Sequence, residues 1–335
     1  MNPKLKKVLL ATAGTLTLAT GALAVATVVR ENRHFEAPIP DIHASHDPAV
    51  IQRGHYLVRG AAHCADCHSA RAQRPALEAG QDVPLAGGFE FHLPIGVFRV
   101  PNITPDAETG IGRYSDGELA RMLRHGVRPD GRMMLPFMPF ADLSTDDLTA
   151  VISYLRAQSP VRHAVAAHAP NVLGHLVKAF VIAPKGPSRP ITPSVPPGPT
   201  VENGRYLAHN VGNCVMCHTK VDMRTGAIAG PLFGGGAIHE AVDDPTRKFV
   251  APNLTPHPRW GWIASWPEEV FVARMHLGKQ REGSPMPWHG FRRMNDDDLR
   301  AVFRYLQTVP PAEGGPDPSQ KDAVVALAGE HRQQP

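Results

Sequence analysis

The stretch "HCADCHSA", residues 63–70, places two cysteines three positions apart and a histidine directly after the second. Taken alone, Cys64 and Cys67 could hold a metal ion, form a redox disulfide or attach a larger group. The chain has 4 cysteines, and the other two recur in "CVMCH", residues 214–218. All the cysteines therefore belong to two copies of one C-x-x-C-H motif.

C-x-x-C-H is the attachment signature of c-type haem, in which two thiols bond one porphyrin and the adjacent histidine reaches its iron. A zinc site made of all four cysteines would join pairs roughly 150 residues apart and leave both histidines unexplained. A disulfide within either motif would close a very short loop. The motifs predict two covalent haem sites, formed by Cys64, Cys67 and His68 and by Cys214, Cys217 and His218.

The surroundings of the two motifs repeat as well. "RGHYL", residues 53–57, corresponds to "NGRYL", residues 203–207, and each ends seven residues before its first cysteine. "PNITP", residues 101–105, corresponds to "PNLTP", residues 252–256. An internal repeat of this kind indicates two structural units of similar fold.

Each half also carries an apolar stripe at i, i+3, i+4 and i+7, in residues 148–155 and 299–306. This spacing predicts an amphipathic helix in each half. Ser144 and Asn295 are the expected N-caps of these helices.

A second pair of helices is expected to begin at the S-x-x-E capping boxes of Ser115 and Ser265. We expect an all-α fold, because the chain shows no sustained strand alternation. Gly54 and Gly204 should let the helix before each motif cross the last helix of its half closely.

The N-terminus differs in character from the rest. Three lysines precede an uncharged run, residues 8–29, which as a helix of about 33 Å could cross a hydrocarbon core of about 30 Å. "ALAVA", residues 22–26, offers small-residue cleavage sites. Residues 1–30 are therefore predicted to be a signal peptide or a membrane anchor, and both alternatives export the remaining chain.

A sixth iron ligand should lie well downstream of each motif, on a loop that folds back over the porphyrin. Met138 in "PFMPF" and Met286 in "SPMPW" share a Met-Pro-aromatic word, at 138 − 64 = 74 and 286 − 214 = 72 residues from the first cysteine. They are the predicted ligands, with packing against an aromatic ring as the alternative. Met134 or His125 could replace Met138.

The C-x-x-C-H, N-x-T-P and Met-Pro-aromatic motifs together resemble those of the class I c-type cytochrome domains of bacterial membrane-bound alcohol, gluconate and sorbitol dehydrogenases and their stand-alone dihaem relatives. The resemblance covers about residues 38–158 and 197–309. It implies that Cys64, Cys67, His68 and Met138 serve one haem c, and Cys214, Cys217, His218 and Met286 a second. Those dehydrogenase subunits usually carry three haems, whereas this chain has two attachment motifs.

The N-x-T-P loops would lie near the haem edges, where Asn102 or Asn253 could position a propionate, with a purely structural loop role as the alternative.

The residue pattern predicts an N-terminal hydrophobic helix in residues 1–30, a proline-rich linker in residues 159–196 and a polar tail in residues 312–335. The resemblance implies that residues 38–158 and 197–311 form two tandem cytochrome c domains. Short helices are expected at residues 172–182 of the linker and 321–328 of the tail.

We expect an electron carrier rather than an enzyme, and we assign no catalytic residue. It would work in the periplasm or at its membrane face, between a dehydrogenase or quinol and an oxidase or other terminal acceptor. A haem enzyme, such as a dihaem peroxidase or a thiosulfate-oxidising cytochrome, is the alternative. The net charge of +4 does not indicate nucleic-acid binding. The glycine run 234–236 does not fit a nucleotide loop, since no G-x-G-x-x-G follows a strand.

Overall fold

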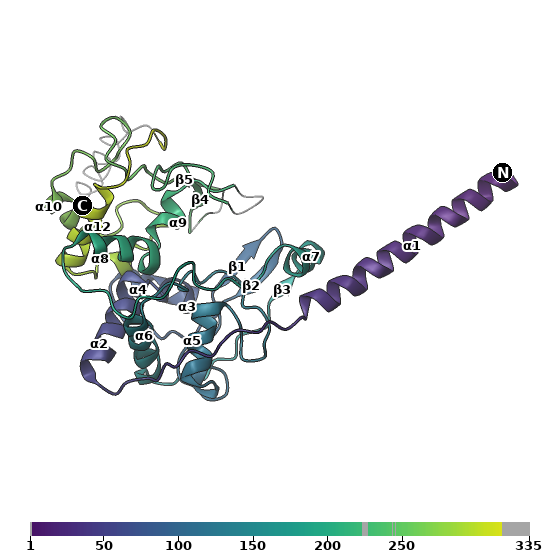
Figure 1. Cartoon of the computed structure of the whole chain (residues 1–335), viewed down its shortest axis with the longest axis horizontal. Coiled ribbons are helices and arrows are strands. Elements are labelled where there is room, and N and C mark those ends of the chain that lie inside the picture. The colour runs from purple at the N-terminus through teal and green to yellow at the C-terminus, as the bar shows by residue number, and fades with distance from the viewer. Residues whose placement is uncertain (1, 223–226, 243, 245, 317–335) are drawn as a thin grey trace.

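The computed structural model describes residues 2–222, 227–242, 244 and 246–316. The helix expected at residues 321–328 lies outside this range. Helix α1, Pro3–Glu31, projects from the body of the protein as a single exposed rod (Figure 1). The linker helix α7, Val172–Phe180, confirms the helix expected there.

The two halves share a common succession of helices, and each adds one short helix of its own. A helix that ends in a π-helical turn leads into a short helix with the cysteines, and two longer helices follow a loop. The first half contains α2 Pro48–Tyr56, the π turn Leu57–Ala61, α3 Ala65–His68, α4 Arg74–Glu78, α5 Asp116–His125 and α6 Thr145–Ala157. The second half contains α8 Val201–Tyr206, the π turn Leu207–Val211, α9 Cys214–His218, α10 Glu268–Leu277, α11 Trp288–Phe291 and α12 Asp296–Leu306.

The expectation of a purely helical fold is wrong, because the described residues include two small antiparallel sheets. The first has the order β1-β2-β3 and pairs Phe91 with Phe98, while the second pairs β4 with β5. Strands of two to four residues are too short for the period-two alternation that reveals a strand in a sequence. The strands are β1 Glu90–Leu93, β2 Gly96–Arg99, β3 Ala169–Pro170, β4 Ile238–Glu240 and β5 Lys248–Val250.

The predicted glycine crossings are confirmed. A Cβ atom on Gly54 would lie 1.9 Å from the Ala150 carbonyl oxygen of α6. A Cβ atom on Gly204 would lie 1.8 Å from the Ala301 carbonyl oxygen of α12. Only glycine permits such close backbone contact, so each half is built on the same crossing of its first and last helices.

Three of the four predicted helix starts are confirmed. The side chains of Ser144 and Asn295 cap α6 and α12, and Ser115 forms a full capping box on α5. The fourth prediction is wrong, because α10 begins at Glu268 and not next to Ser265. Pro267 explains the difference, since a residue that precedes a proline is disfavoured in the helical conformation that the box would require.

The halves are joined by two tyrosines that each reach into the opposite half. The Tyr56 hydroxyl donates to Asp298 Oδ2 at 2.6 Å, and the Tyr206 hydroxyl donates to Asp147 Oδ2 at 2.8 Å. Both aspartates lie in the first turn of a final helix and are buried. The repeat thus makes a reciprocal contact, in which the first helix of each half bonds to the last helix of the other.

We expect Tyr206→Phe to lower the free energy of unfolding by about 2 kcal/mol. The substitution leaves the buried Ser144 amide, which donates to this hydroxyl at 3.0 Å, without its acceptor. Tyr154→Phe is the matched control, because the Tyr154 hydroxyl accepts from Arg59 within the first half. Denaturant titration followed by circular dichroism measures both, and an unchanged midpoint for Tyr206→Phe would contradict the role of the contact.

Candidate functional site

The first motif forms one helical turn that places both thiols on the same side. Cys64 is the N-cap of α3, and its carbonyl accepts from the amides of Cys67 at 3.3 Å and His68 at 2.9 Å. Both cysteines are half-buried free thiols, and the histidine ring is buried. Residues three apart on a helix are neighbours, so the two sulfur atoms can bond to one planar molecule.

The second motif repeats this turn in α9. Cys214 is half-buried, Cys217 is exposed and His218 is buried. The residue before each first cysteine has a left-handed backbone, with φ of 40° at His63 and 51° at Asn213. The sequence left His63 without a role, and the structure shows that it occupies the reversal from the π turn into the motif.

Both motif histidines are oriented by a proline carbonyl. His68 Nδ1 lies 2.9 Å from the Pro101 oxygen, and His218 Nδ1 lies 3.0 Å from the Pro252 oxygen. When Nδ1–H donates to a carbonyl, Nε2 keeps its lone pair for a metal. Burial lowers the pKa of each histidine to about 4, so the rings are neutral at pH 7. This is the protonation state that an axial ligand requires.

The thiols do not have the character of redox-active cysteines. Burial raises the pKa of Cys64, Cys67 and Cys214 to about 12 and also raises the pKa of Cys217. Redox catalysis by C-x-x-C pairs depends on a lowered thiol pKa. Within the part of the chain that the structure describes, no three side chains of His, Cys, Asp or Glu gather as metal ligands. Among these residues, the two cysteine pairs are not gathered at one place.

Two glycines that the sequence analysis missed hold the proline loops against the motifs. The amides of Gly87 and Gly235 each donate to the carbonyl of a motif histidine, at 2.8 Å. Their φ angles are 72° and 71°, and a Cβ atom would lie 2.5 Å from the Val100 oxygen or 2.6 Å from the Asn253 amide. A signal was present, because a glycine pair follows the motif histidine by 87 − 68 = 19 and 235 − 218 = 17 residues.

The asparagines of the N-x-T-P loops serve the loops themselves. Asn253 is fully buried, and its Oδ1 accepts from the amide and hydroxyl of Thr255 at 2.8 and 2.7 Å. Its Nδ2 donates to the carbonyls of Ala312 and Gly314. Asn102 makes the same bonds to Thr104. Both hydrogens of the Asn253 side-chain amide are donated to these carbonyls, so none is left for a propionate. The structure therefore favours the alternative, in which this asparagine holds its own loop.

We expect Asn253→Ala to lower the free energy of unfolding by about 3 kcal/mol, because several buried polar atoms lose their partner at once. Asn32→Ala is the control, since Asn32 is exposed and should cost less than about 0.5 kcal/mol. Thermal unfolding of the two variants compares them directly. Equal melting temperatures would show that the loop is not held by Asn253.

The predicted sixth ligands occupy corresponding places in the two halves. Met138 lies in the loop between α5 and α6, and Met286 lies in the loop between α10 and α11. Both are half-buried and pack against the apolar core. Met134 is also half-buried, and His125 ends α5. The assignment of Met138 and Met286 to iron stays a prediction.

Residues of the first candidate site also contact residues near the second predicted methionine. Asp66, between the first two cysteines, has its Oδ2 3.4 Å from Nε2 of His289, which follows Met286 by three residues. Both side chains are largely buried. A Cβ atom on the neighbouring Gly290 would lie 2.8 Å from the Gly60 oxygen of the π turn. The first attachment motif thus contacts the segment that carries the second predicted methionine.

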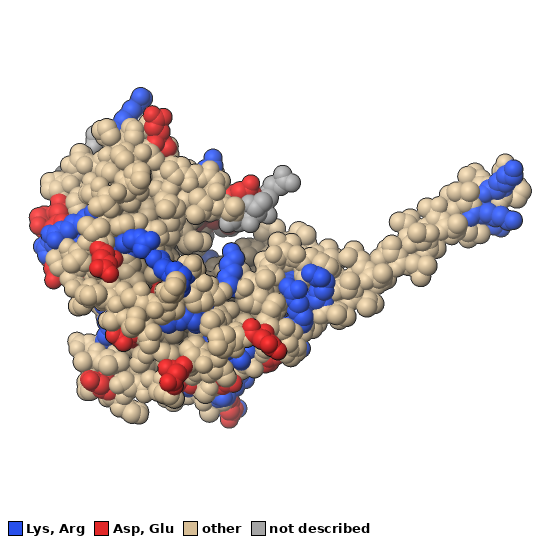
Figure 2. Space-filling model, in the orientation of Figure 1, with Lys and Arg blue, Asp and Glu red and all other residues tan. Residues whose placement is uncertain are grey.

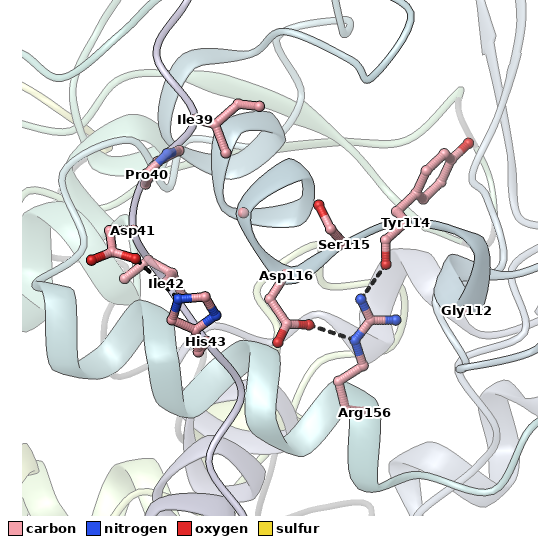
Figure 3. Close-up of a pocket in the computed structure, with 11 residues that line it drawn as sticks. Ile39, Pro40, Asp41, Ile42, His43, Gly112, Tyr114, Ser115, Asp116 and Arg156 are labelled. Atoms are coloured by element: carbon pink, nitrogen blue, oxygen red, sulfur yellow. Dashed lines mark hydrogen bonds and ion pairs between the residues drawn. The ribbon is translucent and has the colours of Figure 1, made fainter.

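The pocket drawn in Figure 3 lies elsewhere, between residues 39–43 and 112–117. Asp116 and Arg156 form an ion pair of 2.8 Å across it, and Arg156 also donates to the Tyr114 carbonyl. The Asp116 carboxylate accepts from the Ala44 amide as well. These bonds fix the chain before α2 to the start of α5, and no residue of either motif lines the pocket.

Comparison with known proteins places these sites in context. The chain is 33% identical over 294 residues to the cytochrome c subunit of alcohol dehydrogenase (quinone) from Gluconobacter oxydans, covering 82% of the chain and 58% of that subunit. It is 30% identical over 310 residues to the gluconate 2-dehydrogenase cytochrome c subunit of Pantoea cypripedii, covering 84% of the chain and 64% of that subunit. No family model matches the chain.

A shorter relative is covered more fully. The chain is 27% identical over 258 residues to a diheme cytochrome c-type protein of Cereibacter sphaeroides, covering 75% of the chain and 83% of that protein. The chain spans less than two thirds of the length of the dehydrogenase subunits. The resemblance inferred from the motifs is confirmed: relatives at about 30% identity over most of the chain are cytochrome c subunits of dehydrogenases.

Proposed function

We propose that this protein binds two haem c groups covalently and transfers single electrons in the periplasm or at its membrane face. It would accept them from a dehydrogenase or a quinol and pass them to a terminal acceptor. The observation that carries the proposal is the duplicated site, in which a two-thiol turn ends in a neutral, buried histidine oriented by a proline carbonyl. The names of the relatives support the same class of activity.

The residues fit the proposed group in three respects. Each C-x-x-C turn would bond one porphyrin through two thioethers, and the motif histidine would supply its Nε2 to the iron. Met138 and Met286 would each supply a thioether sulfur to the iron. A bound haem supplies reversible one-electron chemistry. The chain itself orients the ligands, because the carbonyls of Pro101 and Pro252 each hold one imidazole in one tautomer.

We also propose that the halves are tandem cytochrome c domains over residues 38–158 and 197–311. The support is the matched glycine crossing and the reciprocal tyrosine contact. The proline-rich segment 159–196 would link the domains. The contact between Asp66 and His289 would place the first attachment motif against the segment of Met286, the predicted ligand of the second haem, which suits electron exchange within one molecule.

We further propose that α1 anchors the protein in the cytoplasmic membrane. Its uncharged run, residues 8–29, is apolar and long enough to cross a bilayer, and most of the helix projects away from the body. A cleaved signal would pass the same test of length and composition. Retention is favoured because the last turn of α1 is held by α7 through Glu31, which bonds to His175 and Lys178.

Haem content tests the central proposal. The purified chain should contain two haems, as counted by the pyridine haemochrome assay and by intact mass under denaturing conditions. Cys214→Ala with Cys217→Ala should remove one of them and leave the other reducible by ascorbate or dithionite. A chain that binds no haem when co-expressed with a cytochrome c maturation system would overturn the proposal.

A further inference from the structure

We propose that α7 is a membrane-surface helix, which lies on the lipid headgroup region of the bilayer beside α1. The inference rests on the proposed role of α1 as an anchor. It starts from an apolar surface on and just after α7 that the protein leaves uncovered. The exposed fractions are 78% for Val172, 53% for Leu173, 43% for Phe180 and 69% for Val181, and we call these four residues the α7 apolar surface.

The opposite side of α7 is locked to the first sheet, so this surface cannot turn inward. The N-cap Asn171 donates from Nδ2 to the Pro94 carbonyl at 2.9 Å and from its backbone amide to the Ile95 carbonyl at 3.1 Å. Gly174 lies so close that a Cβ atom would stand 2.1 Å from the Ile95 oxygen. Ala179 is fully buried. The orientation of α7 is therefore set by the turn between β1 and β2.

The polar edge of α7 is tied to the end of α1. Glu31 pairs with Lys178 at 2.9 Å and with His175 at 2.7 Å. Arg30 donates to the Ala179 carbonyl, and its guanidinium lies 5.0 Å from the centre of the Phe180 ring. Figure 1 shows α7 beside the root of the α1 rod.

This connection determines the level at which α7 would lie. Arg30 and Glu31 directly follow the apolar run 8–29, so they mark the point where an inserted α1 would leave the hydrocarbon core. A helix bonded to these residues lies at the same level, where its surroundings are lipid headgroups. The four side chains of the α7 apolar surface are each 43–78% exposed. The boundary between lipid headgroups and acyl chains would cover such side chains.

The charges near this level fit a lipid surface as well. Figure 2 shows a long rod without charged side chains between basic side chains at its tip and a group of basic side chains where it meets the body. Arg30 lies against the Phe180 ring of the α7 apolar surface, and Lys178 is on the same helix, paired with Glu31. An apolar face bordered by Lys and Arg is the pattern of helices that lie in the plane of an anionic membrane.

Site-directed spin labelling of the full, haem-loaded chain tests the proposal, because the native cysteines are then bonded to haem. One nitroxide is placed at Val172→Cys and, as a matched control, another at Val270→Cys. Val270 is an exposed valine on α10, 45% accessible. Helix α10 lies far from α1 in Figure 1. The chain is reconstituted without any partner protein into vesicles of phosphatidylcholine with one third phosphatidylglycerol. Collision rates with dioxygen and with a water-soluble nickel chelate are then measured.

The expected result is a ratio of dioxygen to nickel collisions several-fold higher at position 172 than at position 270. Equal ratios in a chain that resists carbonate extraction would overturn the role of α7 and leave the anchor standing. That outcome would point to a protein subunit as the occupant of the α7 apolar surface. A chain that carbonate removes from the vesicles would overturn both the anchor and the inference.

Discussion

Gly204→Ala is expected to lower the free energy of unfolding by more than about 3 kcal/mol and to reduce the yield of haem-loaded protein sharply. The added Cβ atom would stand 1.8 Å from the Ala301 carbonyl oxygen, 2.4 Å from its carbon and 2.9 Å from the Tyr305 Cβ atom. None of these atoms is the far end of a flexible side chain, so α8 and α12 would have to move apart. The separation would reach the second motif, since the π turn that follows α8 leads directly into it.

Gly60→Ala is the matched control for this prediction. Gly60 is also buried and also precedes a motif, yet the nearest atoms to an added Cβ lie 3.8 Å away. We expect that variant to fold and to load haem as the unmodified chain does. Haem absorbance per mole of protein and denaturant titration compare the two. If Gly204→Ala were as stable as Gly60→Ala, the close crossing would not be what holds the second half together.

Met138→Ala and Met286→Ala are expected each to remove about half of the red-edge charge-transfer absorption of the oxidised protein, and the double variant all of it. Each substitution should also lower the reduction potential of its own haem, by on the order of 100 mV. The reason is that a thioether ligand favours reduced iron relative to the nitrogen or oxygen ligands that would replace it. Spectra and redox titrations of the two single variants measure both effects.

Met134→Ala and Met294→Ala are the controls. Met134 is the fallback ligand for the first haem, and Met294 is a buried core residue of the second half, 5% exposed. Both should keep the full absorption, although Met294→Ala should lose about 2–3 kcal/mol of stability through the cavity it leaves. Loss of the band in Met134→Ala would move the first ligand to that position. An unchanged spectrum in the double variant would refute both assignments.

The sequence predicted best those features that depend on neighbouring residues. The helix starts at Ser115, Ser144 and Asn295 were correct because a cap and its helix lie within one turn of chain. The start at Ser265 failed for an equally local reason, the proline at 267. The strands were missed because pairs such as Phe91 and Phe98 are held by a short turn and not by a long alternating pattern.

The features that sequence reasoning missed join distant parts of the chain. Gly87 bonds to the His68 carbonyl across 19 residues, and Tyr206 reaches Asp147 across 59. No spacing rule indicates such partners, although the doubled glycine after each motif was a usable clue. Asn253 could be placed near the site by its motif, but only its buried hydrogen bonds showed that it serves the loop.

The sequence by itself determined which residues are proposed to carry the chemistry, because C-x-x-C-H holds its two thiols and its histidine within five consecutive residues, and all four cysteines occur in the two copies. It also determined the two helix crossings, since Gly54 and Gly204 recur at the same place in each repeat. Only the tertiary structure decided the proline carbonyl that orients each histidine, the reciprocal tyrosines and the position of α7 beside α1. These depend on contacts between residues far apart in the chain, which close only when the chain is folded.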